Sequence, residues 1–165
     1  PNVLTPSHAE QAQTLASKMA TATLCTMSIE PAGYPYGSFV TYAIYEGNPI
    51  FLISGVAEHT KNLDKDSKAS LLIAEAGEGN PLALGRVTLM GDCKRLSEEH
   101  RENVRDIFLS KNPDSKFYID FKDFYFYRLE VSEVRYIGGF GRMSWITDEQ
   151  WFKACLLYTS DAADD

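Results

Sequence analysis

The ten residues 54–63, SGVAEHTKNL, place two hydroxyls, an imidazole, an ammonium and an amide directly after the apolar run 49–53. A serine and a glycine end that run before a polar segment of helical composition, so the stretch predicts a strand, a turn and a helix start. A helix N-terminus presents unpaired backbone N–H groups and partial positive charge, which suit an anion such as a phosphate. The candidate ligands for such an anion are Ser54, His59, Thr60, Lys61 and Asn62.

The same stretch has a second interpretation, as a solvated turn followed by an ordinary charged helix face. Glu58, Lys61, Asp64 and Lys65 are spaced as such a face would be. Spacing alone favours this second interpretation over an anion site. The rest of the chain therefore has to decide between them.

The flanking segments predict the fold. Apolar or alternating runs bounded by turn residues predict strands at 25–29, 36–45, 49–53, 69–74, 84–96 (bent at Gly91), 123–130 and 134–137. Capping and periodicity predict helices from Ser7 to about residue 20, over 97–110, and after Thr147. We expect a mainly β (α+β) fold, a small antiparallel β-barrel with short flanking helices, because closing the sheet removes its exposed edges.

The composition is that of a single folded domain. At 165 residues with 44% hydrophobic content, the chain can bury about two-thirds of its unfolded surface. No apolar run reaches the length of a membrane span, and the N-terminal segment lacks the pattern of a secretory signal. We expect a soluble protein that is not exported and that has no membrane partner.

The last eleven residues, 155–165 (CLLYTSDAADD), resemble a translated sequencing adapter. We therefore expect one domain over 1–154, truncated at its C-terminal end, followed by a non-native tail. Without the three tail aspartates the chain is only mildly acidic, which argues against nucleic-acid binding. Cys25 and Cys93 then remain, with no CxxC or Cys/His cluster, which indicates a reduced compartment and no metal site.

Two further features are candidates for ligand binding. Arg86 stands between Leu84 and Val87 in an apolar strand, where a guanidinium group is costly unless it meets an anion. An outward-facing surface arginine is the alternative. The run 138–142, GGFGR, implies positive φ angles or a close backbone approach, with Arg142 as a fixed cation. A β-bulge or tight corner is the alternative there.

Four motifs in order, SGVAEHTKNL, ASLLIAE, NPLALGRVTLMG and YRLEVSEVRYIGGFGR, resemble the split-barrel superfamily of pyridoxamine-5′-phosphate-oxidase-like, FMN-binding proteins. More narrowly, the chain resembles the haem-utilisation branch, which includes haem-degrading enzymes and plant plastid relatives. The resemblance covers about residues 7 to 154 and implies a six-stranded antiparallel split β-barrel. It also implies a homodimer with cofactor sites at the dimer seam, in the cytoplasm or, for a photosynthetic eukaryote, in the plastid stroma.

The resemblance implies roles for the candidate residues. In flavin-binding relatives the FMN phosphate is held at positions matching Ser54, Thr60, Lys61, Asn62 and the strand of Arg86. The flavin ring would lie against 37–41. Pyridoxamine-phosphate oxidases have an arginine where this chain has Gly37-Ser38, which argues against tight FMN binding and vitamin-B6 oxidation.

In the haem branch, the resemblance places Arg142 against a haem propionate or the distal pocket. Haem iron needs an axial side chain, which that branch supplies from near the C-terminus, beyond the GGFG loop, so we expect the truncation at 154 to have removed it. This chain has no histidine after His100. His8 and His100 are expected on solvated helices and are poor ligands.

Three functional hypotheses follow. The first is an FMN-binding split-barrel protein that acts as a flavin- or haem-linked oxidoreductase, since the bound cofactor would carry the chemistry. The second is a non-catalytic protein that uses the dimer groove to bind haem or a partner in tetrapyrrole metabolism. The third, a pyridoxamine-phosphate oxidase, is the least favoured because of Gly37-Ser38.

Overall fold

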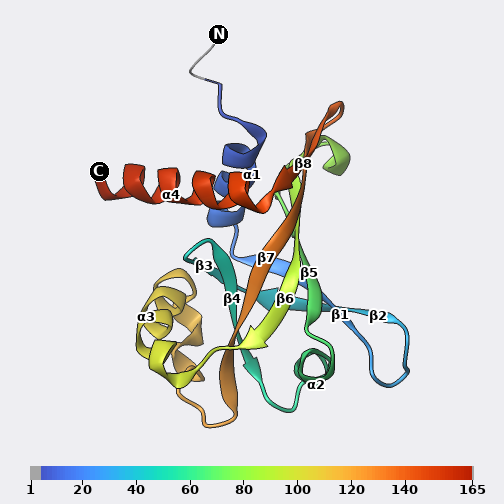
Figure 1. Ribbon diagram of the computed structural model, residues 1–165, viewed down its shortest axis with the longest axis vertical. Helices are drawn as coiled ribbons and strands as arrows, with labels where there is room; N and C mark the ends of the chain where they lie inside the picture. The colour runs from blue at the N-terminus through green and yellow to red at the C-terminus, as the bar shows by residue number, and fades with distance from the viewer. Residues whose placement is uncertain (1–4, 165) are drawn as a thin grey trace.

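One antiparallel β-sheet curls into a half-barrel and forms the body of the protein (Figure 1). The computed structural model describes residues 5–164. The strand order is β2-β1-β5-β6-β7-β4-β3, with β8 beside β7. The strands are Thr21–Met27 (β1), Pro35–Thr41 (β2), Ala43–Tyr45 (β3), Asn48–Ser54 (β4), Lys68–Ala74 (β5), Arg86–Arg95 (β6), Phe124–Gly139 (β7) and Arg142–Thr147 (β8). The predicted mainly β (α+β) class with an antiparallel, barrel-like sheet is confirmed.

The long strand β7 connects the parts of the sheet. It pairs with β6 along most of its length, with β4 near its start and with β8 near its end. It joins two segments, 123–130 and 134–137, that the sequence predicted as separate strands. The predicted bend at Gly91 is confirmed, because the β6–β7 register shifts between Met90 and Gly91.

The described chain has eight strands, against six in the expected barrel. The predicted segment 36–45 divides into β2 and β3, because Tyr42 turns inward between them. The Tyr42 N–H donates to the Ala20 carbonyl at 3.1 Å, and its hydroxyl donates to the Ala16 carbonyl at 2.5 Å. The second addition is β8, which returns along β7 after a glycine-rich turn.

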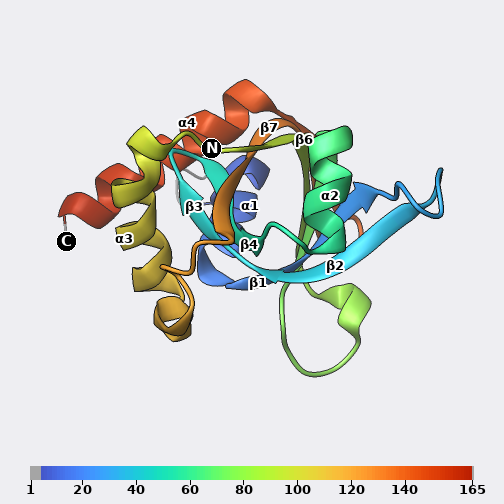
Figure 2. The ribbon, with the colours of Figure 1, turned by 90° about the horizontal axis from the view of Figure 1, so that it is seen from below.

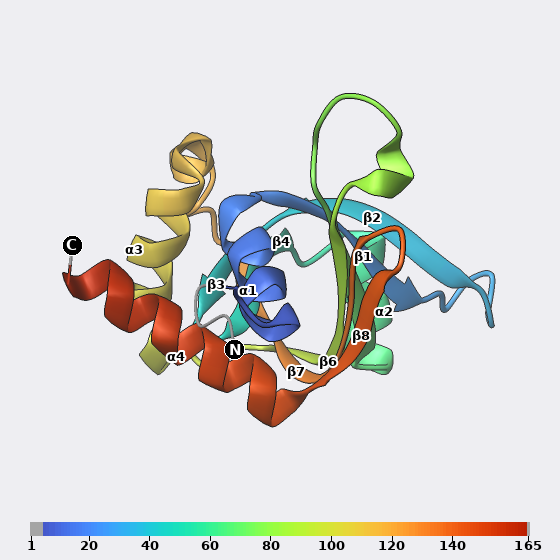
Figure 3. The same ribbon diagram turned by 90° about the horizontal axis from the view of Figure 1, so that it is seen from above.

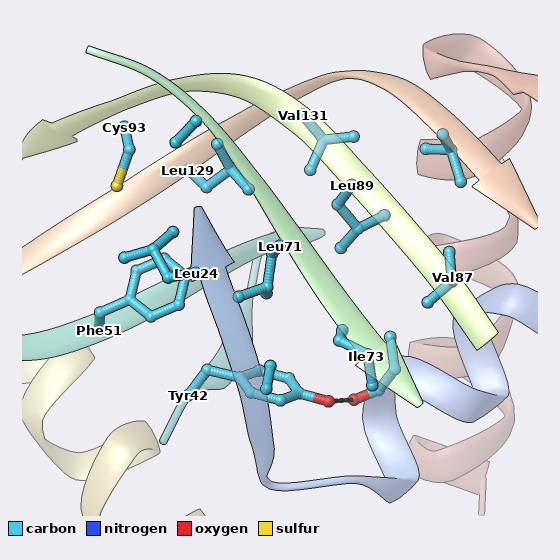
Figure 4. Close-up of a cluster of buried hydrophobic side chains, with 14 of the residues drawn as sticks. Leu24, Tyr42, Phe51, Leu71, Ile73, Val87, Leu89, Cys93, Leu129 and Val131 are labelled. Carbon is cyan, nitrogen blue, oxygen red and sulfur yellow. Dashed lines mark hydrogen bonds between the residues drawn. The ribbon is translucent and has the colours of Figure 1, made fainter. Parts of the chain in front are cut away.

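Successive side chains of each strand point to opposite faces of the sheet, and those on the inner face form the core. In β6, Val87 and Leu89 are fully buried, whereas the intervening Thr88 is only partly buried. Figure 4 shows these side chains packed inside the curled sheet with residues from neighbouring strands. The ten labelled members of this cluster are Leu24, Tyr42, Phe51, Leu71, Ile73, Val87, Leu89, Cys93, Leu129 and Val131.

Four α-helices flank the sheet in the described residues: α1 (His8–Lys18), α2 (Glu58–Lys65), α3 (Arg101–Lys111) and α4 (Asp148–Asp164). Short 3₁₀ helices are η1 (Pro81–Ala83), η2 (Glu98–His100) and η3 (Pro113–Phe117). Helices α1 and α4 cross at one end of the sheet, beside the β7–β8 hairpin (Figure 3). The predicted capping box of α1 is confirmed: the Glu10 N–H donates to Ser7 Oγ at 3.1 Å, and the Ser7 N–H to Glu10 Oε1 at 3.3 Å.

Helix α4 is anchored by Trp151, which is fully buried and donates its indole N–H to the Gly47 carbonyl at 2.8 Å. The helix continues through 155–164, within the segment that resembles an adapter. The assignment of that segment as a non-native tail stays a prediction. Among the described residues, no helix has the length and apolar character needed to cross a membrane.

Candidate functional site

The stretch 54–63 has the strand, turn and helix that its sequence predicts. Strand β4 ends at Ser54, the Gly55 N–H donates to the Asp123 carbonyl at 2.7 Å, and α2 begins at Glu58. Helix α2 lies against β1 and β6 (Figure 2), at the end of the sheet away from α1 and α4 (Figure 1). Its N-cap, Ala57, provides no side-chain hydrogen bond to the first turn. The start of α2 therefore has the partial positive charge expected of a helix N-terminus.

The buried polar side chains of this stretch are engaged in the fold itself. Thr60 is 1% exposed and donates its hydroxyl to the Ser54 carbonyl at 2.6 Å. Asn62 is 2% exposed and joins α2 to the end of β1. Its Oδ1 accepts from the Ile29 N–H at 3.2 Å, and its Nδ2 donates to Thr26 Oγ1 at 3.1 Å. These bonds give both side chains a structural task that the sequence did not reveal.

The remaining donors of this stretch lie nearer the surface. Lys61 is exposed and its ammonium lies 3.8 Å from the Glu58 carboxylate. The Ser54 hydroxyl accepts from the Val56 N–H at 3.3 Å. An exposed ion pair of this kind is weak, so it leaves Lys61 able to meet an anion. The phosphate role of this stretch stays a prediction, with Ser54 and Lys61 as its accessible side chains.

His59 is the one candidate here with a buried polar atom lacking a hydrogen-bond partner within the described chain. That atom is Nε2. Burial lowers the pKa of His59 below its usual value, because the surrounding protein disfavours the charged imidazolium. The neutral imidazole is therefore the form that suits the folded protein.

This burial predicts a pH dependence of stability. The unfolded chain takes up a proton at His59 near its ordinary pKa of about 6.5, but the folded chain does so only at lower pH. The contribution of His59 to the free energy of unfolding is thus complete above about pH 6.5 and decreases as the pH falls below it. Urea unfolding at about pH 7.5 and about pH 5.5 should show a smaller acid-induced loss for His59→Gln than for the wild type. His100→Gln, at a partly exposed histidine, is the control, and an equal loss in His59→Gln and wild type would refute the assignment.

Arg86 lies at the opposite end of the sheet from α2. It pairs with Ala74 at the end of β5, whereas α2 leads into the start of β5, where Lys68 pairs with Asp92. Six residues of strand separate these two ends, which is roughly 20 Å at about 3.3 Å per residue. One chain therefore does not bring Arg86 to the residues of 54–63.

The guanidinium of Arg86 is incompletely satisfied. The residue is partly buried, and its Nη1 is shielded from solvent without a hydrogen-bond partner among the described residues. A shielded charged N–H that lacks an acceptor is destabilising by about 1–3 kcal/mol or more. This atom is one of four such side-chain atoms among the described residues; the others are Ser38 Oγ, His59 Nε2 and Arg128 Nε. An acceptor from outside the single chain would satisfy it.

Arg142 follows the turn between β7 and β8. Gly139 and Gly141 have φ values of 126° and 75°, so the glycines of GGFGR form a tight corner as one of the two sequence interpretations expected. Arg142 donates to the Gly138 carbonyl at 2.5 Å. The turn lies at the same end of the sheet as Arg86, which pairs with Ile137. A haem-facing role for Arg142 stays a prediction.

The feature that sequence reasoning missed is an apolar surface on the outer side of the sheet. We call it the outer face, and it comprises outward side chains of the six strands β1, β2, β5, β6, β7 and β8: Thr23, Cys25, Met27, Phe39, Ser70, Leu72, Ala74, Arg86, Thr88, Met90, Arg135, Ile137, Met143 and Trp145. Phe39, Trp145 and Met143 are 79%, 63% and 50% exposed. Arg135 lies over the Trp145 ring, 5.2 Å from its centroid. Exposed apolar side chains gathered on one face indicate an interaction surface.

The outer face also has a pocket near the end of the sheet where α2 lies. A pocket of about 480 Å³ is lined by Cys25, Met27, Ser70 and Met90. Ser70 of β5 pairs with Cys25 of β1 on one side and with Met90 of β6 on the other. The sequence signal for the outer face was the alternation of β6, where Arg86, Thr88 and Met90 share one side. No pattern in the sequence predicted strand β8, which carries both Met143 and Trp145.

A curled antiparallel sheet with short helices at its ends defines a split-barrel protein. The family model described as "CREG, beta-barrel" matches residues 4–153. The chain therefore belongs to the CREG β-barrel family.

Similar proteins include two whose names refer to haem. The chain is 40% identical over 134 residues to the non-canonical heme oxygenase HOZ, chloroplastic, of Arabidopsis thaliana, covering 81% of this chain and 41% of that protein. A solved heme binding protein from Mycobacterium smegmatis is 40% identical with a TM-score of 0.85, covering 92% of this chain and 62% of the other. The chain thus spans less than two-thirds of the length of either relative.

A third comparison concerns the fold alone. A protein of the pyridoxinephosphate oxidase family from Clostridium acetobutylicum, related to general stress protein 26, is 12% identical with a TM-score of 0.68, covering 88% of this chain and 99% of the other. The resemblance to pyridoxamine-phosphate-oxidase-like split barrels and to their haem-utilisation branch is confirmed by these matches.

Proposed function

We propose that this chain binds haem on its outer face and that it does so as a homodimer, with the haem at the seam between two copies. The observation that carries the proposal is the shielded Nη1 of Arg86, which has no acceptor in the described chain. A haem propionate is a carboxylate, the anion whose geometry best matches a guanidinium group. The names of the Arabidopsis and Mycobacterium relatives support haem as the ligand.

The surroundings of Arg86 suit the rest of a haem molecule. Its neighbour across the sheet is Ile137, followed by Met143 on β8, and Trp145 lies two residues further along that strand. These apolar side chains offer a contact surface for a porphyrin, while Arg86 would bind the propionate groups at the edge of the porphyrin. Sites for small molecules commonly combine an apolar lining with a few placed polar groups in this way.

The size and character of the outer face support the proposed homodimer. Phe39, Leu72 and Trp145 come from strands on both sides of β6, so the exposed apolar side chains extend across most of the sheet. A second copy placed on this face would bury them, and a two-fold axis would use the same surface from both chains. The haem would then be shielded from water on both sides.

Haem is an established source of redox chemistry when bound to protein. We therefore propose a haem-linked oxidoreductase in a reduced compartment, either the cytoplasm or the plastid stroma. The contribution of the chain itself would be to hold the propionate through Arg86, to cover the porphyrin with apolar side chains and to exclude water from the seam. A non-catalytic haem- or partner-binding protein is the alternative, since one fold serves several functions.

FMN is the second candidate ligand, and the side-chain bonds of α2 make it the weaker one. The uncapped N-terminus of α2, with Ser54 and Lys61 nearby, supports a phosphate site. However, Thr60 and Asn62 already bond within the chain. Gly37-Ser38 also lacks the arginine expected of a pyridoxamine-phosphate oxidase, so this third hypothesis remains the least favoured.

Parallel titrations with hemin and FMN distinguish these ligands. We expect hemin to give a Soret band that stays with the protein on gel filtration, at close to one haem per chain, and light scattering to give the mass of a dimer. FMN should elute separately. Retained flavin bands and no retained Soret band would favour FMN and overturn the haem proposal.

A further inference from the structure

Three sulfur-bearing side chains line the pocket of the outer face near α2: Cys25 and Met27 of β1, and Met90 of β6. Cys25 and Met90 are partly buried and Met27 is 38% exposed, so the pocket can be reached from the surface of the sheet. The proposed haem site uses none of the three. Arg86 lies four residues from Met90 along β6, which is roughly 13 Å at about 3.3 Å per residue.

The cross-strand register gathers these three side chains around one point. Ser70 pairs with Cys25 on one side and with Met90 on the other, so two strand spacings, roughly 9.6 Å, separate the backbones of Cys25 and Met90. Met27 lies two residues further along β1, roughly 6.6 Å from Cys25. The residue between the two strands is a serine, whose short side chain leaves the pocket of about 480 Å³ open above it. An unbranched methionine has three rotatable bonds, which let its sulfur turn toward Cys25 across this space.

We infer that this pocket binds a soft monovalent metal ion, copper(I), through the Cys25 thiolate and the thioethers of Met27 and Met90. Thiolate and thioether sulfurs are soft ligands that favour copper(I), whereas zinc sites are usually built from several thiolates or imidazoles. In the part of the chain that the structure describes, no group of three His, Cys, Asp or Glu side chains could hold a metal. The expected absence of a metal site rested on Cys and His alone, a criterion that does not include methionine.

The charges around the pocket suit an ion with a single positive charge. Cys25 supplies one negative charge once its thiol has lost its proton, and thioethers are neutral, so the complex as a whole is uncharged. Lys68 and Asp92, which pair with each other and also line the pocket, contribute opposite charges. Binding forms a sulfur–copper bond, breaks the S–H bond of Cys25 and releases the proton to water, and copper keeps its oxidation state. An uncharged complex avoids the cost of placing an unpaired charge in a mostly apolar pocket.

Anaerobic competition for copper(I) between the protein and the chelator bicinchoninate tests the site with five proteins: wild type, Cys25→Ser, Met27→Leu, Met90→Leu and Met143→Leu. We expect the wild type to bind one copper(I) per chain, more weakly as the pH falls because protons compete for the thiolate. Cys25→Ser should lose at least about 100-fold in affinity, and each of Met27→Leu and Met90→Leu about tenfold or more. Met143→Leu, an outward methionine near the Arg86 end of the same face, is the matched control and should bind as the wild type does. Leucine conserves the volume of methionine, so these variants should keep the fold.

Each other outcome overturns the inference for a different reason. Unchanged affinity in Cys25→Ser would show that copper(I) binds at another group. Unchanged affinity in both Met27→Leu and Met90→Leu would show that a thiol binds the metal without thioethers, and this test does not depend on how Cys25→Ser folds. An equal loss in Met143→Leu and Met90→Leu would show that the effect is not local to the pocket. A wild-type protein that takes no copper(I) from the chelator would refute the site and leave the proposed haem function standing, because that function is tested separately with hemin.

Discussion

Replacing Arg86 with glutamate is expected to abolish haem binding, with a loss of affinity of at least about 100-fold. A charge-assisted hydrogen bond contributes about 1.5–3 kcal/mol, and two like charges placed together at an interface oppose binding by several kcal/mol more. The guanidinium is expected to meet a propionate because its Nη1 is shielded and has no acceptor in the described chain. Arg86→Glu reverses the sign of the charge at that atom.

The measurement is a hemin titration followed at the Soret band, with Lys94→Glu as the control. Lys94 lies on the same strand and is exposed. It pairs with Arg128, far along β6 from the pair of Arg86 and Ile137. The control changes the net charge by the same amount, so it separates a local effect from a general electrostatic one. Equal affinities for Arg86→Glu and Lys94→Glu would show that Arg86 does not contact the ligand.

The second large effect is expected at Gly91, where an alanine should destabilise the fold by at least about 3 kcal/mol. A Cβ at this position would lie 1.8 Å from the Glu130 carbonyl oxygen and 2.8 Å from its carbonyl carbon. These atoms belong to the backbone of β7, so they cannot move away as a flexible side chain would. Strands β6 and β7 would have to separate at the bend on which the curled sheet depends.

Thermal or urea unfolding of Gly91→Ala measures this effect, and Gly85→Ala is the matched control. Gly85 precedes the same strand, but an added Cβ there would meet its nearest atom, Glu75 Oε2, at an ordinary 3.6 Å. We expect the control to unfold close to the wild-type midpoint. A Gly91→Ala protein as stable as Gly85→Ala would mean that the β6–β7 bulge tolerates a side chain, contrary to the packing described above.

The fold was largely predictable because its signals are local. Alternation in β6, the Ser7–Glu10 capping box and the strand, turn and helix around Ser54 each depend on a few neighbouring residues. The outer face was not predictable, because it requires the pairing of β8 with β7. A six-residue strand after three glycines, 142–147, carries too weak a period-two pattern to be recognised from sequence.

The candidate site was predicted only in part, for a similar reason. Thr60 and Asn62 looked like accessible donors at a helix start, but their partners, Ser54 and Thr26, are determined by how α2 packs onto the sheet. Asn62 bonds to a residue 36 positions away. The sequence left open whether Arg86 faces outward or meets an anion, and the structure gives it both an outward position and a shielded atom without an acceptor.

The location of the iron tests the central claim most directly. Crystals of the hemin complex, measured at the iron absorption edge, give an anomalous difference peak that marks the iron without any assumption about the fold. We predict one peak per chain, on the outer face beside Arg86 and Ile137, between two copies of the sheet. A peak beside α2 and His59, or on the inner side near His8, would contradict the account.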